Sequence, residues 1–82
     1  MSSNSDNDDF LLIERAQNGH EGAFNFLMTK YYPRVYASLY SYTKSREDSE
    51  DLTQQTFVKV WQQIKTFRGD SAFFTWVYRI AI

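Results

Sequence analysis

The sequence contains no cysteine, which excludes disulfide bridges and metal sites built on thiolates. The single histidine, His20, has no second imidazole with which to share a metal ion, so we expect neither a metal nor another cofactor. The chain also lacks an apolar run near the roughly 20 residues needed to span a bilayer. Its polar start lacks the basic and apolar parts of a signal peptide. These absences predict a soluble, cytoplasmic protein that does not bind membranes.

Residue patterns for catalysis are missing as well. His20 has no nucleophile pattern beside it, and the carboxylates do not show the spacing of metal ligands. The three glycines form no phosphate-binding loop. The sequence therefore predicts a protein that is not an enzyme.

Charge is nearly balanced over the whole chain, with a formal net charge of −1, but it is unevenly distributed. Residues 1–51 carry five basic and nine acidic side chains, a net charge of −4. Residues 52–82 carry four basic side chains and one acidic side chain, a net charge of +3. Because cationic side chains supply most of the affinity for phosphate backbones, any contact with nucleic acid is expected late in the chain.

The length of 82 residues allows one small domain with a single hydrophobic core. Residues 1–8 are mostly Ser, Asn and Asp, too polar to repay the entropy of ordering, so we expect a disordered tail there. The folded domain is then expected over residues 9–82. Apolar residues recur there at helical spacing and nowhere alternate as in a strand. The sequence predicts an all-α fold, a compact bundle of about four helices.

The first two predicted helices are bounded by residues that begin or end helices. The first follows Asp8 and Asp9, and Gly19 ends it. The second begins at Glu21, and its apolar positions keep one helical phase straight through Pro33. Because proline removes a backbone donor and clashes with the preceding turn, we predict one kinked helix. Its apolar positions are Phe24, Leu27, Met28, Tyr31, Val35 and Leu39.

The third and fourth predicted helices are separated by a glycine. The third opens near Ser45 or Ser49, either of which can cap it, with acidic residues in its first turns. Gly69 interrupts the helical pattern, and Asp70 or Ser71 is placed to cap the fourth helix, which runs to the end of the chain. The predicted buried side of the third helix consists of Leu52, Phe57, Val60, Trp61 and Ile64.

Five aromatic residues lie among the twelve residues 67–78, interleaved with Arg68 and followed by Arg79. Unpaired bases stack on flat aromatic faces, at about 1–3 kcal/mol per base, while nearby cations hold the phosphates. This composition favours binding of single-stranded nucleic acid. A small helical domain also needs an aromatic core, and composition alone leaves that alternative open.

Helical spacing divides the residues of the fourth helix into two sides. One side carries Phe73, Val77 and Ile80, which we predict to be core. Another side combines a small residue, a hydroxyl, an indole and a guanidinium, and is predicted to face a nucleic-acid strand: Ala72, Thr75, Trp76 and Arg79. In the loop just before this helix, Phe67 and Arg68 could form a pocket for a flipped-out base.

A second candidate surface lies on the outer side of the third helix. The polar residues spaced to lie together there are Asp51, Gln54, Gln55, Lys59 and Gln62. Such a stripe is commonly a solvated face. Its amides and carboxylate could instead bind the helices of a partner protein through hydrogen bonds.

Three segments in a fixed order give a specific family resemblance. They are DLTQQTFVKVW at residues 51–61, FRGDS at residues 67–71 and TWVYRIA at residues 75–81. Together they resemble conserved region two of the extracytoplasmic-function (ECF) sigma factors of bacterial RNA polymerase. The similarity is weaker toward Asp9, passing through Tyr31-Tyr32-Pro33 and Ala23-Phe24.

The resemblance implies a function in transcription initiation. In that family, the helix with the Asp-x-x-Gln motif binds the clamp helices of the largest polymerase subunit, which implies contacts from Asp51 and Gln54. Gln55 and Lys59 lie on the same stripe and are included in the expected polymerase surface. Gln55 departs from the acidic residue that many members carry at this position. An anti-sigma factor is expected as a further partner.

The resemblance also implies capture of a base flipped from the non-template strand of the minus-ten promoter element. The expected pocket lies around residues 67–71, and the following helix tracks the melting edge of the duplex. The expected DNA-binding residues are Lys65, Phe67, Arg68, Gly69, Asp70, Ser71, Thr75, Trp76 and Arg79.

The chain stops on apolar residues at Ile82, which suggests a natural chain cut short. Many relatives place an Asn directly after that position, and the helix-turn-helix domain that binds the minus-thirty-five element is also missing. The alternative to promoter recognition is a helical adaptor that binds only proteins. Its aromatic residues would all be core, and its acidic first half would bind a basic partner. Binding of an anti-sigma factor would also use this surface, and the two functions can coexist.

Overall fold

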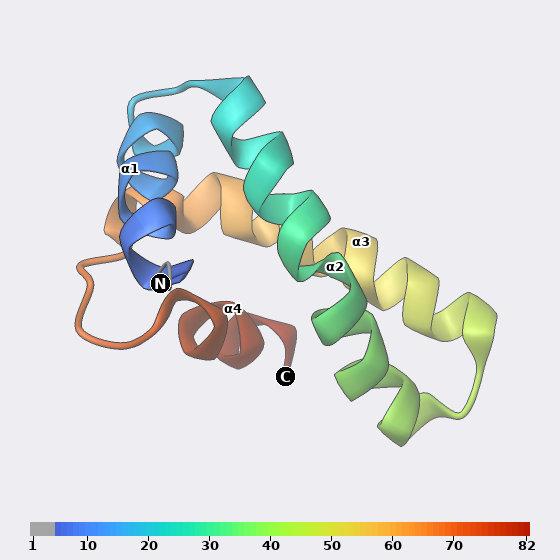
Figure 1. Ribbon diagram of the computed structural model, residues 1–82. Coiled ribbons are helices and arrows are strands. Elements are labelled where there is room, and N and C mark those ends of the chain that lie inside the picture. The colour runs from blue at the N-terminus through green and yellow to red at the C-terminus, as the bar shows by residue number, and fades with distance from the viewer. Residues whose placement is uncertain (1–4) are drawn as a thin grey trace.

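The computed structural model describes residues 5–82, and within that range the chain is built from helices without a strand (Figure 1). The elements are α1 (Ser5–Gln17), α2 (Glu21–Thr43), α3 (Arg46–Gln63), the short 3₁₀ helix η1 (Ile64–Thr66) and α4 (Phe73–Ala81). The predicted all-α fold with about four helices is confirmed. In the part of the chain that the structure describes, no helix is both long and apolar enough to cross a membrane.

Helix α1 begins earlier than the sequence predicts. Its first residue is Ser5, so residues 5–8, expected in a disordered tail, form part of a helix. The rest of the predicted tail, residues 1–4, lies outside the described residues. After Gln17 the chain turns at Gly19, whose φ of 91° is in the left-handed region that glycine tolerates.

Helix α2 packs against α1, α3 and α4. In Figure 1 it crosses in front of α3, with α1 and α4 on the same side of that crossing. The helix is continuous through Pro33, which confirms the prediction of one helix rather than two. It ends at Thr43, and the N–H of the C-cap Lys44 donates to the Tyr40 carbonyl at 2.9 Å. The left-handed φ of Lys44 (56°) then turns the chain away from the helix axis. The buried stripe of α2 is Ala23, Phe24, Leu27, Tyr31, Val35 and Leu39.

Helix α3 begins at a hydrogen-bonded cap. Ser45 is the N-cap, and its hydroxyl oxygen accepts from the Asp48 N–H at 3.2 Å. The Thr43 hydroxyl oxygen accepts from the Ser45 N–H at 3.0 Å and lies 2.7 Å from the Ser49 hydroxyl. Of the two predicted caps, Ser45 has that function, whereas Ser49 is buried within the first turns of the helix.

The predicted burial of Leu52 is wrong, because 38% of this residue is exposed. The buried residues of α3 before Phe57 are instead small and polar: Ser49, Thr53 and Thr56. Their hydroxyls are satisfied locally, since Thr53 donates to the Ser49 carbonyl at 2.6 Å and Thr56 donates to the Leu52 carbonyl at 2.7 Å. Leu52 precedes Thr53 by one residue and is therefore rotated about 100° away from the buried side.

The remaining core predictions hold in the second half of α3 and at the start of η1. Phe57, Val60 and Ile64 are buried, and Trp61 packs partly buried against the core. Each such apolar side chain contributes about 1.5–3 kcal/mol on full burial. These residues form the surface against which α4 packs, since α3 contacts both α2 and α4.

Candidate nucleic-acid interface

The loop of residues 67–72 connects η1 to α4 and is held in place from α1. The Gln17 side-chain amide donates to the carbonyls of Ile64 and Phe67, both at 2.9 Å. Gly69 has a left-handed φ of 81°, which turns the loop toward α4. Sequence reasoning missed Gln17, because its two partners lie 47 and 50 residues further along the chain.

Two hollows adjoin this loop on its α1 side. The smaller, of about 140 Å³, is lined by Phe10, Ile13, Glu14, Gln17, Phe67, Arg68 and Gly69. The larger, of about 350 Å³, is lined by Asp9, Phe10, Ile13, Phe67, Gly69, Ser71, Ala72 and Phe73. The larger volume is on the scale of pockets for small ligands. The sequence placed a pocket at the loop but did not predict that α1 supplies its second wall.

Helix α4 has the core side that its spacing predicts. Phe73 and Val77 are buried, and Ile80 is half-buried against the core. The predicted caps Asp70 and Ser71 are wrong. The N-cap is Ala72 without a side-chain hydrogen bond, and the helix begins at Phe73. The Ser71 hydroxyl instead donates to the Ala72 carbonyl at 3.3 Å, so it is not aimed at the free N–H groups of the helix.

The predicted DNA-facing residues divide into exposed and half-buried groups. Phe67, Ser71 and Trp76 are half-buried, and the Trp76 ring packs 5.2 Å from Phe67 and 6.0 Å from Phe73. Trp76 lies at the border between the core and solvent because it is three residues, slightly less than one turn, from Phe73. The exposed group is Lys65, Arg68, Gly69, Asp70, Ala72, Thr75 and Arg79.

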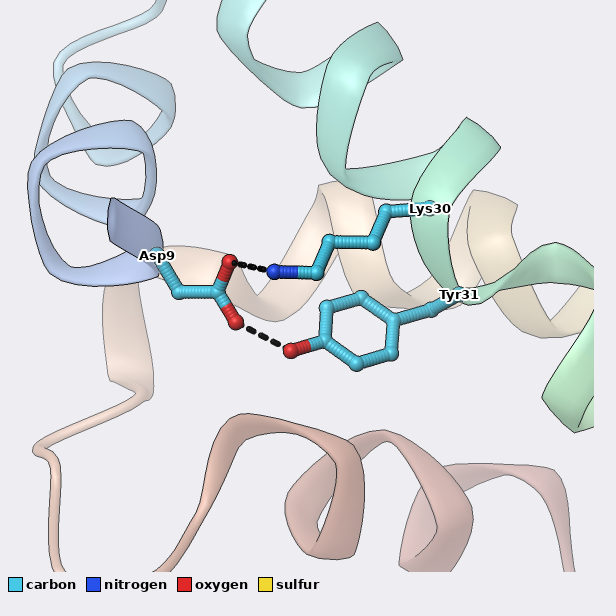
Figure 2. A network of polar contacts seen from close by, with 3 residues as sticks. All are labelled: Asp9, Lys30 and Tyr31. Atoms are coloured by element: carbon cyan, nitrogen blue, oxygen red, sulfur yellow. Dashed lines mark hydrogen bonds and ion pairs between the residues drawn. The ribbon is translucent and has the colours of Figure 1, made fainter. Parts of the chain in front are cut away.

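A buried carboxylate, that of Asp9, joins α1 to α2 (Figure 2). Asp9 also lines the larger hollow. Asp9 is 3% exposed and accepts from the Lys30 ammonium at 2.8 Å and from the Tyr31 hydroxyl. The Tyr31 ring packs 5.6 Å from Phe73 and 6.1 Å from Phe74. The Asp9 network therefore fixes the position at which α4 starts. Its sequence signal was weak, since Asp9 is also an ordinary residue for a helix start.

The polar stripe on α3 is exposed as its spacing predicts. Asp51, Gln54, Gln55, Lys59 and Gln62 are all exposed. Gln54 also lies at the edge of an apolar groove of about 390 Å³ between α2 and α3. The other residues of the groove are Glu21, Phe24, Asn25, Met28, Tyr32, Phe57, Val58 and Trp61. Sequence reasoning missed this groove because two helices form it together.

Residues 27–82 match the model of the sigma-70 region 2 family. The chain belongs to this family. The ECF RNA polymerase sigma-E factor of Haemophilus influenzae is 46% identical to it over 74 residues, or 90% of this chain and 39% of the relative. The Escherichia coli sigma-E factor is also 46% identical over 74 residues. The chain is thus a region 2 domain of the ECF type, and it spans about two fifths of the length of these relatives.

A solved structure resembles most of this region 2 domain. It is an NMR structure of an engineered region 2 of sigmaE in complex with GTAAAA. The TM-score is 0.82 at 37% sequence identity, and the match covers 89% of this chain and 76% of the other.

Proposed function

We propose that this region 2 domain belongs to a transcription initiation factor that binds core RNA polymerase and recognises and melts the minus-ten promoter element. The proposal rests on the hollow of about 350 Å³ between the loop of residues 67–72 and α1. The exposed cations Arg68 and Arg79 lie on the loop and on α4. The complex of a related region 2 with GTAAAA supports a DNA strand as the ligand.

In the proposed complex, one base of the non-template strand leaves the stack and enters the larger hollow. Flipping a base out costs a few kcal/mol, and contact with aromatic side chains recovers about 1–3 kcal/mol. Phe67 and Phe73 line the hollow and supply that aromatic contact. Ser71 and the backbone at Gly69 supply polar groups for the edge of the base.

The rest of the strand follows the exposed residues of the loop and of α4. Lys65, Arg68 and Arg79 bind phosphates, which fixes the register of the strand without sequence preference. Asp70 is exposed and accepts hydrogen bonds from base amino groups. Thr75 and the free edge of Trp76 contact the strand beside Arg79 on α4.

The outer side of α3 is the proposed polymerase surface, formed by Asp51, Gln54, Gln55 and Lys59. All four side chains are exposed, which leaves their hydrogen-bonding groups available to the clamp helices of the largest subunit. Gln55 is neutral and contributes an amide rather than a charge. An anti-sigma factor that covers this side of α3 would compete with the polymerase. Such a function belongs in the cytoplasm.

Fluorescence titration with single-stranded oligonucleotides tests the DNA proposal. One oligonucleotide contains GTAAAA, and a scrambled oligonucleotide of the same composition is the control. The domain is expected to bind the GTAAAA oligonucleotide more tightly, because only the matched sequence places the correct base at the hollow. Equal affinity for both would contradict base recognition and favour the helical adaptor that binds only proteins.

A further inference from the structure

Helix α4 has a second aromatic edge that the proposed recognition of the minus-ten strand does not use. Phe74 and Tyr78 are four residues apart on α4, and their rings stack with centroids 5.9 Å apart. Across from them, on α2, the Arg34 guanidinium lies 4.1 Å from the centroid of the Phe74 ring. It also lies 5.8 Å from the Tyr31 ring, which itself stacks on Phe74 at 6.1 Å.

The position of this edge on the helix places Arg34 beside the proposed DNA surface. Successive residues of an α-helix are rotated by about 100°. The exposed residues Thr75 and Arg79 therefore lie between the Trp76 edge on one side and the Tyr78 edge on the other. Because Arg34 stacks on Phe74 next to Tyr78, α2 extends the cationic surface of α4 past that second edge.

The two cations of α2 in this region differ in their partners. Lys30 is neutralised by the buried Asp9 at 2.8 Å. Arg34 is exposed and makes no ion pair with any residue in the range 9–82, over which the structure describes the side chains. A guanidinium that lies over a ring keeps its N–H edge free, and that edge matches the oxygens of a phosphate. Arg34 thus has an unused charge in a fixed orientation.

The tyrosine beside this arginine adds no negative charge. A hydrogen bond with Tyr42 raises the pKa of Tyr78 above its ordinary value. Tyr78 therefore stays neutral at physiological pH, where its ring adds flat surface. An anionic strand meets one positive charge and two neutral aromatic rings at this edge.

We propose that Arg34, seated on Phe74, binds a backbone phosphate of the single strand that α4 recognises. The inference deepens the proposed function, on which it rests for the identity of the ligand. It assigns α2 a part in DNA binding that neither the sequence motifs nor the loop pocket indicate. A phosphate contact at Arg34 is independent of base sequence, whereas the hollow at the loop distinguishes bases.

The test is a salt titration of the same two oligonucleotides with three variants. Arg34→Gln removes the charge, and Arg34→Met removes it while keeping an apolar stem over Phe74. Arg46→Gln is the matched control, because it removes the same charge from the exposed first residue of α3 at the α2–α3 connection. One phosphate contact on a single strand contributes about 0.7 to the slope of log affinity against log salt. A slope of about 0.7 corresponds to about a fivefold gain in affinity when the salt concentration falls from 1 M to 0.1 M.

In both Arg34 variants the slope is expected to fall by about 0.7 and the affinity at 0.1 M salt by about fivefold. The two losses are expected to be equal for the matched and the scrambled oligonucleotide. Arg46→Gln is expected to behave as the unsubstituted chain. An unchanged slope in both Arg34 variants, or an equal loss in Arg46→Gln, overturns the phosphate contact and leaves Arg34 as a packing residue. Equal binding of the two oligonucleotides by the unsubstituted chain overturns the proposed base recognition instead, and the slope difference at Arg34 still reports the contact.

Discussion

The carboxylate of Asp9 lies buried between Lys30 and Tyr31, and Tyr31 in turn packs on Phe73 at the start of α4 (Figure 2). One side chain of α1 thus orders residues of α2 and, through them, of α4. Removing this acceptor is costly, because it leaves the hydroxyl of the buried Tyr31 without its partner. Asp9 therefore affects the proposed DNA surface by positioning α4, in addition to lining the larger hollow.

Asp9→Asn is expected to lower the free energy of unfolding by about 1–3 kcal/mol, because it breaks the ion pair and leaves a buried amide beside Lys30. Urea denaturation followed by circular dichroism measures the loss. Glu14→Gln is the control, since it removes a charge from an exposed position of the same helix. Its expected effect is within about 0.5 kcal/mol. Equal effects of the two substitutions would show that the Asp9 network does not stabilise the fold.

Trp76 shows how a residue can belong to both the core and a surface. Its spacing with Thr75 and Arg79 predicts exposure, yet its ring is half-buried against Phe67 and Phe73. The sequence-based expectation of a freely exposed indole is therefore revised. Substitution of Trp76 by a small residue removes packing under the loop, so any loss of DNA binding would include a loss of order there.

At the scale of elements, the α3–α4 connection depends on its backbone more than on its side chains. Gln17 holds the end of η1 and the start of the loop through two carbonyls. Gly69 supplies a left-handed turn in space where an added Cβ would meet no atom within 4 Å. The demand on residue 69 is therefore conformational and not steric. The loop keeps its path because α1 and this glycine act together.

Gly69→Ala is expected to cost about 1–2 kcal/mol, the price of a left-handed backbone for a residue with a Cβ. Gly22→Ala is the matched substitution, and it is expected to raise the free energy of unfolding rather than lower it. Gly22 lies in α2, and alanine is favoured over glycine in a helix by about 0.5–1 kcal/mol. A Cβ added at Gly22 would lie 3.8 Å from the nearest atom of the His20 side chain, an ordinary van der Waals contact. Thermal unfolding of both variants checks the difference. If both substitutions shifted the unfolding temperature in the same direction, the loop would not constrain the backbone of residue 69.

At the scale of the whole molecule, the two proposed surfaces lie on separate elements that share one core. The polymerase surface is the outer side of α3, and the DNA surface combines the loop, α4 and Arg34 of α2. Both α3 and α4 pack on α2, and α1 closes the loop from behind. A small domain can thus bind two partners at once because each partner meets the outer side of a different helix.

Asp51→Asn and Gln54→Ala are expected to reduce capture of core RNA polymerase several-fold while leaving the unfolding midpoint unchanged, since both residues are exposed. A pull-down with purified core enzyme measures the capture. Glu14→Gln on α1 is the charge-matched control and should retain full capture. Unaltered capture by both α3 variants would remove the proposed polymerase surface while leaving the DNA proposal standing.

The sequence alone determined the fold class and most of the helix positions. Apolar residues at helical spacing identified the buried stripe of α2 through Pro33 and the core side of α4 at Phe73 and Val77. These predictions succeeded because a helix repeats every 3.6 residues, so its buried side is visible in the local order of residues. The ordered motifs of residues 51–81 likewise identified the family.

The tertiary structure decided what depends on two or more elements at once. The hollow at the loop needs α1 as its second wall, and the groove beside Gln54 needs both α2 and α3. Asp9, Gln17 and Arg34 gain their importance from partners at least 21 residues away in sequence. Local periodicity carries no information about such distant pairs, because it records which side of a helix is buried and not which helix covers it. The close packing of helices in three dimensions supplied that information.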